Sequence, residues 1–492
     1  MHILNARIIR TLSVLPKRLG PSVFSFYVSL VLSAISILNN VVIGRDAALY
    51  LDVAIVYSQE GWQSAYMQYG WPWFSILLAF VHKFIPIPLD VTAYLVCALL
   101  MAGTCFIWVR IMEDCVPGSG WWACLVVLSV PGFNELRGDI LREFGYWFFS
   151  AVAIWQCLLW YKIRGYIRLV CVYGAIAAAT LFRPEAFYLI PPVLGVQCFV
   201  LIADRSLTRI DKLELLFFVL LVFFLIVVAS LKLTPDLERA QLYISYLTPE
   251  VIFESFSSMS SQLAESMPYK YSRDDAGMIV FFGVAGTLLF YFLRSLGPFI
   301  VPFMVVGDIE PFRLPGYVRV FFSVCFFLYF CVLMLFFFNS QFVSGRYVST
   351  LSWLAIPFVV VRAGRAEARC PILSRILVLA ALLVMVGSTV SLSDKKFHYI
   401  DAGLWVRENV GLGASVYFED RRIAFYAGRR VPTNPYPVDV AINEKINEFD
   451  YFVIRLDREN VGLQELIASG EIHSNAEFEN NHGGVIGVFS KD

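Results

Sequence analysis

Residues that could take part in a group-transfer reaction lie at four turns of this sequence, each beside a long apolar run. The candidates in chain order are Asp46, Tyr50 and Asp52; Arg142 and Glu143; Arg183 and Glu185; Arg346 and Tyr347. The planar arginine fork binds phosphate oxygens in bidentate fashion, and a carboxylate can accept a proton from an attacking hydroxyl group. These residue types therefore suit group transfer at a phosphate ester.

Each turn also has a structural explanation. Asp46 alone can simply mark the end of a membrane helix, and the polar stretch 131–143 can cap the helices on either side of it. Arg183 before Pro184 also fits a kinked helix with a snorkelling arginine. A functional role is favoured over these structural explanations because charged residues recur at one expected level of the membrane. The middles of the apolar runs, in contrast, hold almost no titratable residue.

The elements that position these residues are membrane helices. Hydrophobic residues make up 58% of the chain and charged residues 16%, with a mean hydropathy of +0.68. This hydrophobic share is larger than the core of a water-soluble domain can bury. Runs such as 215–231 and 320–338 have the length that a helix needs to cross a bilayer. We predict about eleven spans, near 22–43, 89–110, 119–131, 144–162, 167–182, 185–203, 212–231, 276–293, 317–338, 345–361 and 372–391.

The distribution of positive charge predicts the orientation. Four basic residues precede the first span, which we expect to be retained with a cytoplasmic N-terminus. Alternating sides from there places the arginine- and lysine-rich connections in the cytoplasm, and all four candidate turns outside it. The apolar run Trp71–Ile85 is too short for a span and is predicted to be an interfacial or re-entrant helix. We therefore expect a multi-pass protein of the inner (plasma) membrane with an extracytoplasmic active site.

Two domains are predicted. Residues 1–392 would form the transmembrane domain, with external loops 44–88, 131–143 and 233–275. Residues 393–492 are charged throughout and would form a small extracytoplasmic α/β domain. Its expected strands are 415–418, 451–455 and 485–489, and its expected helices are 402–409 and 463–469.

Composition also argues against some partners. The formal net charge is zero, so no basic field indicates nucleic acid as a partner. The chain has only five histidines and no compact cluster with metal-ligand spacing. We therefore expect neither a metal nor another cofactor.

The candidate turns and their order resemble the GT-C superfamily of membrane glycosyltransferases, and in particular the bacterial protein O-mannosyltransferase and aminoarabinose transferase group. The matching features are Asp46 with Tyr50 and Ala54, Gly61-Trp62, the segment Tyr69-Gly-Trp-Pro72-Trp-Phe, Arg142-Glu143, Arg183-Pro184-Glu185, Gly345-Arg346-Tyr347, and in the C-terminal part Trp405 to Asn409, Val416-Tyr-Phe and Phe425 to Gly428. Two positions depart from the pattern of this group. Ala47 stands where an acidic residue often follows the aspartate, and Gly70-Trp71 stands where a lysine can precede the proline of the interfacial helix.

The resemblance implies a GT-C-like fold and an inverting glycosyltransferase whose donor is a sugar on polyprenyl phosphate. The acceptor would be a lipid, a polysaccharide or other glycan, or a protein, reached on the outer face of the membrane. Asp46 would be the catalytic base, and Arg142, Arg183 and Arg346 are the candidates for binding the donor phosphate. Tyr50, Asp52, Glu143, Glu185 and Tyr347 would support them.

Two other functions remain open on the sequence. A transporter or flippase of a lipid-linked or small solute would also have about eleven spans, although transporters usually carry midplane charges or repeated halves, and neither is evident here. A non-catalytic factor in envelope-polysaccharide assembly would explain the loss of the acidic residue at Ala47.

Overall fold

The computed structural model describes residues 20–203, 212, 248–304, 313–390, 395–456, 463, 466, 467 and 470–491. The chain divides into two compact units, and each contains segments that are distant in sequence. The first unit comprises 1–33, 98–137 and 142–389, and the second comprises 34–97, 138–141 and 390–492. The division into domains at residue 392 remains a prediction.

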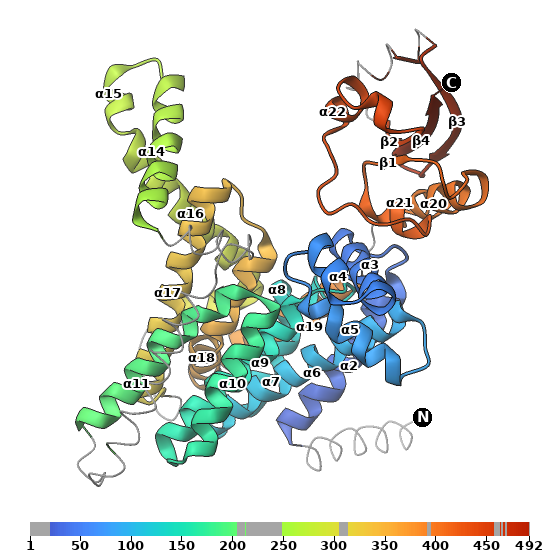
Figure 1. The fold of residues 1–492 in the computed structure, drawn as a ribbon. Coiled ribbons are helices and arrows are strands. Elements are labelled where there is room, and N and C mark those ends of the chain that lie inside the picture. Colours follow the sequence, from blue (N-terminus) through green and yellow to red (C-terminus); the bar gives the residue numbers. More distant parts are fainter. Residues whose placement is uncertain are drawn as a thin grey trace. The chain divides into compact units, whose positions relative to one another are not determined.

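Helices dominate the described residues (Figure 1). Their bounds are α2 (Pro21–Asn39), α3 (Arg45–Glu60), α4 (Trp62–Gln68), α5 (Trp73–Phe84), α6 (Leu89–Cys115), α7 (Gly120–Ser129), α8 (Pro131–Asn134), α9 (Glu143–Lys162), α10 (Tyr166–Phe182), η1 (Pro184–Leu189), α11 (Ile190–Ala203), α14 (Pro249–Ser266), α15 (Lys270–Asp274), α16 (Ala276–Leu296), η2 (Gly297–Met304), α17 (Gly316–Ser340), α18 (Gly345–Arg369), α19 (Pro371–Thr389), α20 (His398–Asn409), α21 (Arg421–Tyr426), α22 (Val438–Asn443) and η3 (Ile446–Glu448).

Seven helical segments among the described residues are long and apolar enough to cross a membrane, so the chain is an integral membrane protein. Three shorter apolar helices accompany them: α5, α7 and α10. The expected span 212–231 falls almost entirely outside the described residues. The count of about eleven spans and their orientation therefore remain predictions.

Helix α18 is the central helix of the first unit. Of its most apolar stretch, 83% is buried, against 22% for both α16 and α19. It contacts α7, α8, α16, α17, α19 and η2. Its buried face includes Ser349 and Ser352 as well as apolar residues, and Ser349 donates a hydrogen bond of 2.7 Å to the carbonyl of Gly132. Ser349 and Ser352 are tolerated in this helix because neighbouring segments of the protein, rather than lipid, satisfy their hydroxyl groups.

Helix α3 belongs to the second unit and packs against α4, α5 and α21. Eight consecutive residues, 47–54, are buried, so α3 is covered on all sides rather than on one stripe. Gly44 precedes the helix at a position where an added Cβ would lie 3.2 Å from Asp139 Oδ1. The short α5 is twelve residues long, consistent with the expectation that the run 71–85 is no full span.

A four-stranded sheet lies in the C-terminal part of the second unit, in the order β1 (Val416–Phe418), β2 (Tyr451–Arg455), β4 (Val485–Lys491) and β3 (Ile472–Glu479). β1 and β2 are parallel, with Tyr417 opposite Phe452, and the other two pairs are antiparallel. Phe452 and Phe489 lie in its hydrophobic core. This mixed sheet with α20 and α22 confirms the predicted small α/β segment.

The strands β1, β2 and β4 match the three that the sequence predicts, and α20 contains the expected helix 402–409. β3 was not predicted. It is an edge strand whose residues are mostly exposed, with a bulge between Ser474 and Ala476, so it lacks the alternation that marks a half-buried strand. Most of the expected helix 463–469 lies outside the described residues.

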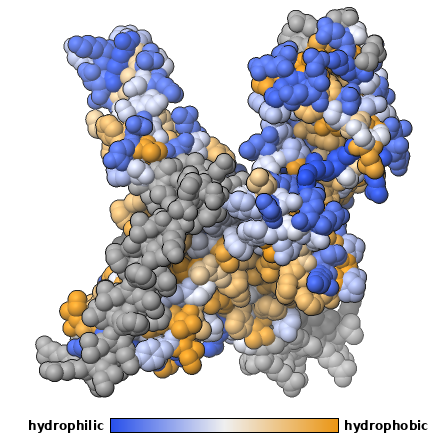
Figure 2. All heavy atoms as spheres, in the orientation of Figure 1, coloured by the Kyte–Doolittle hydropathy of each residue, from blue (hydrophilic) through white to orange (hydrophobic). Residues whose placement is uncertain are grey.

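Hydrophilic and hydrophobic side chains gather on different elements (Figure 2). Hydrophilic side chains cover α14 and α15 and much of the C-terminal sheet region, whereas hydrophobic side chains gather on the long helices. α14 has no buried residue, yet it contacts α16 and α17, and Phe256 packs edge to face on Phe338 with ring centroids 5.3 Å apart. The expected external loop 233–275 thus contains a helical hairpin in its described part.

Candidate active site

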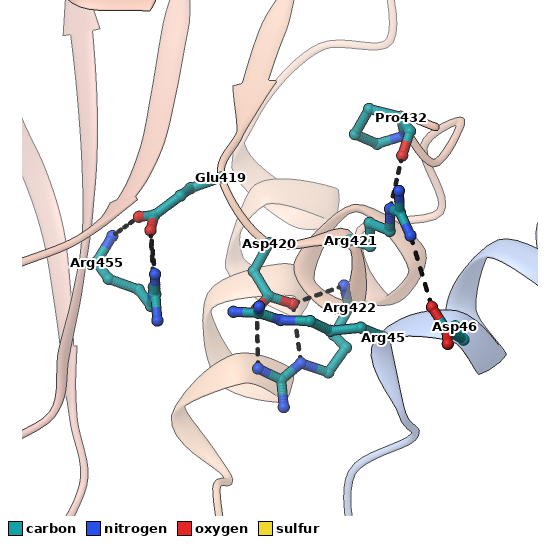
Figure 3. A network of polar contacts seen from close by, with 8 residues as sticks. All are labelled: Arg45, Asp46, Glu419, Asp420, Arg421, Arg422, Pro432 and Arg455. Atoms are coloured by element: carbon teal, nitrogen blue, oxygen red, sulfur yellow. Dashed lines mark hydrogen bonds and ion pairs between the residues drawn. The ribbon is translucent and has the colours of Figure 1, made fainter. Parts of the chain in front are cut away.

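Asp46 lies in the first turn of α3, two residues after the N-cap Gly44. A carboxylate at this position interacts favourably with the positive end of the helix dipole. Its Oδ1 lies 3.7 Å from Nη1 of Arg421, the first residue of α21 (Figure 3). The two side chains are 28% and 20% exposed, so this ion pair remains accessible to solvent.

A second ion pair joins the neighbouring residues. Arg45 Nε lies 2.8 Å from Asp420 Oδ2, and Arg422 donates from Nε and Nη2 to the same carboxylate at 2.8 Å (Figure 3). Burial by itself would raise the pKa of Asp420, but the hydrogen bonds and charge of Arg422, with Arg45, outweigh it and bring the pKa to about 2. Asp420 therefore stays ionised and fixes the start of α21, where it also accepts the backbone N–H of Arg422.

Asp52 is buried and serves a different purpose. Its carboxylate accepts hydrogen bonds from the backbone N–H of Val431 at 2.8 Å and from Gln68 Nε2 at 2.5 Å. Burial raises the pKa of Asp52 more than these two bonds lower it. At the end of the same helix, Glu60 forms an exposed ion pair with Arg430 at 2.8 Å. Asp52 thus anchors the segment around Val431 to α3.

Tyr50 lies in the buried interior of the second unit rather than on its surface. Its ring meets Tyr69 and Phe74 edge to face, with centroids 5.9 and 5.3 Å apart. The described contacts give Tyr50 a packing role beside Asp46.

The first unit holds the other predicted residues in one cluster. Arg183 Nη1 lies 3.2 Å from Glu143 Oε1, and its Nη2 lies 2.7 Å from Glu185 Oε1. Arg346 Nε approaches the same Glu143 oxygen at 3.5 Å. The Arg183 guanidinium also lies over the ring of Tyr347, 4.4 Å from its centroid. Residues from α9, η1 and α18 are thereby brought together.

The members of this cluster differ in exposure. Only 4% of the Arg183 side chain is exposed, whereas the value for Arg346 is 26%. Glu143 Oε2 is buried and has no hydrogen-bond partner among the described residues. Arg142, the N-cap of α9, interacts electrostatically with Glu185. Three arginines and two glutamates leave the cluster with a net positive charge, which suits an anionic ligand.

Sequence reasoning did not single out Arg137, which is 2% exposed. Its guanidinium donates to Asn134 Oδ1 at 2.6 Å, to Ser29 Oγ at 2.7 Å and to Ser33 Oγ at 3.2 Å. These bonds tie α2 to the turn 131–143. The buried serines of α2 at positions 22, 25, 29 and 33 are the signal that a polar partner had to face this helix.

Arg421 was also missed, since nothing in the sequence connects the C-terminal segment to residue 46. The described residues hold no group of three or more His, Cys, Asp or Glu side chains arranged to bind a metal ion. Asp46, Tyr50 and Asp52 belong to the second unit, and the arginine cluster belongs to the first.

Solved structures of other proteins have a similar fold. The chain is similar to the crystal structure of ArnT from Cupriavidus metallidurans bound to undecaprenyl phosphate, with a TM-score of 0.56 and 12% identity over 95% of this chain and 97% of that chain. It is also similar to the Archaeoglobus fulgidus oligosaccharyltransferase in complex with Zn and sulfate, with a TM-score of 0.55 and 12% identity over 94% of this chain and 72% of that one. No protein-family model matches, and no curated protein matches by sequence.

These similarities confirm the predicted GT-C-like fold over nearly the whole chain. At 12% identity they establish the fold and not the reaction.

Proposed function

We propose that the protein is an inverting glycosyltransferase that moves a sugar from a polyprenyl-phosphate donor to an extracytoplasmic acceptor. The observation that carries this proposal is the similarity over 95% of the chain to ArnT bound to undecaprenyl phosphate. A membrane-embedded body with seven long apolar helices among its described residues suits a donor with a polyprenyl tail. The acceptor is a lipid, a glycan or a protein.

The proposed reaction is a single displacement. The acceptor oxygen forms a bond to the anomeric carbon while the bond from that carbon to the phosphate oxygen breaks. The acceptor proton passes to Asp46, and the bonding electrons leave with the lipid phosphate. The roles required are a base for the hydroxyl group and positive charge for the departing phosphate, without a covalent sugar–enzyme intermediate.

The arginine cluster supplies the positive charge in this proposal. Arg346 is the better candidate for direct phosphate contact, because it is partly exposed and lies 3.5 Å from its carboxylate neighbour. Arg183 is enclosed by Glu143 and Glu185, so a phosphate would have to displace one of them. We therefore assign Arg183 mainly to holding the cluster in shape, with Arg142 as the further phosphate candidate.

We further propose that the protein resides in the inner (plasma) membrane with its site and C-terminal segment outside the cytoplasm. Reporter fusions after Asp492 test this orientation. A phosphatase that is active only outside the cytoplasm should be active there, and a cytoplasmic reporter should be silent. The reverse result contradicts the proposed placement of Asp46.

Sugar transfer by the purified full chain tests the function. The protein is reconstituted in vesicles with a panel of labelled polyprenyl-phosphate sugars, and products are separated by mass. A glycosyltransferase changes the linkage of the label, a transporter moves the label across the bilayer with its linkage intact, and a non-catalytic factor does neither. Mass analysis of glycolipids and envelope glycans from cells lacking the protein names the sugar and the acceptor.

A further inference from the structure

The side chain of Arg421 is held in one orientation by backbone carbonyls. Its Nε donates to the carbonyl of Pro432 at 3.1 Å, and its Nη2 donates to the carbonyl of Thr433. The remaining terminal nitrogen, Nη1, faces Asp46 (Figure 3). Because a guanidinium is planar and rigid, fixing two of its nitrogens also fixes the direction of the third.

The loop that carries these carbonyls is itself attached to the helix of Asp46. Val431 N–H donates to Asp52 at 2.8 Å, and Thr433 Oγ1 donates to the carbonyl of Gln68. Arg430 adds its ion pair with Glu60. One turn of the C-terminal segment is thus bound along α3 and α4, which sets the position of Arg421 relative to Asp46.

The Asp46–Arg421 pair contributes little to folding. Both side chains are partly exposed, and exposed ion pairs are typically worth only about 0–1 kcal/mol. At 3.7 Å the pair is also longer than a hydrogen bond, so Arg421 attracts the carboxylate without donating a short hydrogen bond to Oδ1. Such a contact between opposite charges orients the carboxylate.

We propose that Arg421 is a positioning residue for the reaction, which holds the Asp46 carboxylate in the orientation required for proton acceptance. The inference rests on the proposed function of Asp46 as base. It makes the C-terminal segment a working part of the enzyme, because the orienting arginine comes from α21 and the carbonyls that fix it come from residues 432 and 433.

Three variants of Arg421 and one control test this role in the reconstituted full chain. Arg421→Gln should lower kcat by about 10- to 100-fold, the scale on which small misplacement of a catalytic group acts, with KM for the donor within about twofold. Arg421→Lys should keep part of the kcat that Arg421→Gln loses. Arg421→Ala should regain activity on addition of guanidinium ion. The control Arg407→Gln removes an exposed arginine from α20 in the same C-terminal segment, and should stay within about twofold of the unsubstituted protein.

The results separate this inference from the function on which it rests. A kcat for Arg421→Gln within twofold of the parent, while Asp46→Asn is inactive, overturns the positioning role and leaves the glycosyltransferase intact. Loss of rate in both Arg421→Gln and Arg421→Ala with no recovery from guanidinium or lysine also overturns it, because the defect is then structural. If Arg421→Gln fails to accumulate, the kcat of Arg421→Lys decides, and full activity there counts against the role. Absence of sugar transfer by the unsubstituted chain removes the function and the inference together.

Discussion

Arg45 Nε lies 2.8 Å from Asp420 Oδ2, although the two residues are 375 positions apart in the chain. Their neighbours Asp46 and Arg421 form the second pair, so two adjacent residues of opposite charge on α3 meet two adjacent residues of opposite charge at the start of α21. The order of charges is reversed between the two segments, which makes both contacts attractive. Shifting either segment by one residue would set like charges against each other, so the pattern specifies the register of this contact.

The carboxylate of Asp420 should make the protein less stable in acid. Its pKa in the folded protein is about 2, against 3.8 for an ordinary aspartate. A lowered pKa means that the stabilisation is complete above about pH 4 and is lost as the pH falls towards 2, an effect of about 2 kcal/mol. Asp420→Asn should therefore lower the thermal unfolding temperature of the purified chain at pH 7, and the difference should shrink between pH 4 and 2. Asp439→Asn, at an exposed position of α22, is the control, and an equal gap at both ends of that range contradicts the assignment.

Arg137 should stabilise the first unit through hydrogen bonds alone, since the partners described for its guanidinium are neutral. Arg137→Leu leaves Asn134 and two serines of α2 without their donor, which should cost about 1–3 kcal/mol and lower the unfolding temperature in detergent. Arg110, whose side chain is 41% exposed and pairs with nearby carboxylates, is the matched control. If Arg137→Leu unfolds at the same temperature as Arg110→Ala, the buried network carries no net stability.

The seven long apolar helical segments of the described residues coincide with spans that the sequence predicts, because length and apolar composition are local properties of a segment. It also predicts that Arg183 and Glu185 lie together, since they are two positions apart around Pro184. It does not predict that Glu143 joins them at 3.2 Å, because the packing of α9 against α10 and η1 brings them together. Helix packing depends on many side chains at once and leaves no periodic signal at one position.

The contacts of Asp46 were harder still to predict. Glu419-Asp420-Arg421-Arg422 looks like an ordinary charged turn before a short helix, and nothing in its spacing points to α3. In the structure Asp52 bonds to Val431 and Gln68, whereas Asp46 pairs with Arg421.

Arg346 and Arg183 should respond differently to replacement by lysine, which keeps the charge and removes the fork. Arg346→Lys should raise the KM for the donor about tenfold at normal protein abundance, as expected for loss of one charge-assisted hydrogen bond to phosphate. Arg183→Lys should mainly lower the unfolding temperature, because one ammonium group cannot serve Glu143 and Glu185 as the two terminal nitrogens of Arg183 do. An unchanged KM for the donor in Arg346→Lys would mean that Arg346 only anchors the end of its helix.

Asp46 should be the residue whose loss affects the chemical step most. Asp46→Asn preserves the size of the side chain and its place in the first turn of α3, but the amide cannot accept the acceptor's proton. Loss of a general base commonly costs about 10²–10⁴-fold in rate, so kcat should fall by that factor while the protein accumulates normally. Asp52→Asn is the matched control on the same helix. Its carboxylate bonds to Val431 and Gln68, so we expect a loss of stability and a much smaller change in kcat. Near-normal turnover of Asp46→Asn would exclude it as the base, and Glu143, with one buried oxygen lacking a hydrogen-bond partner among the described residues, would be the next carboxylate to replace.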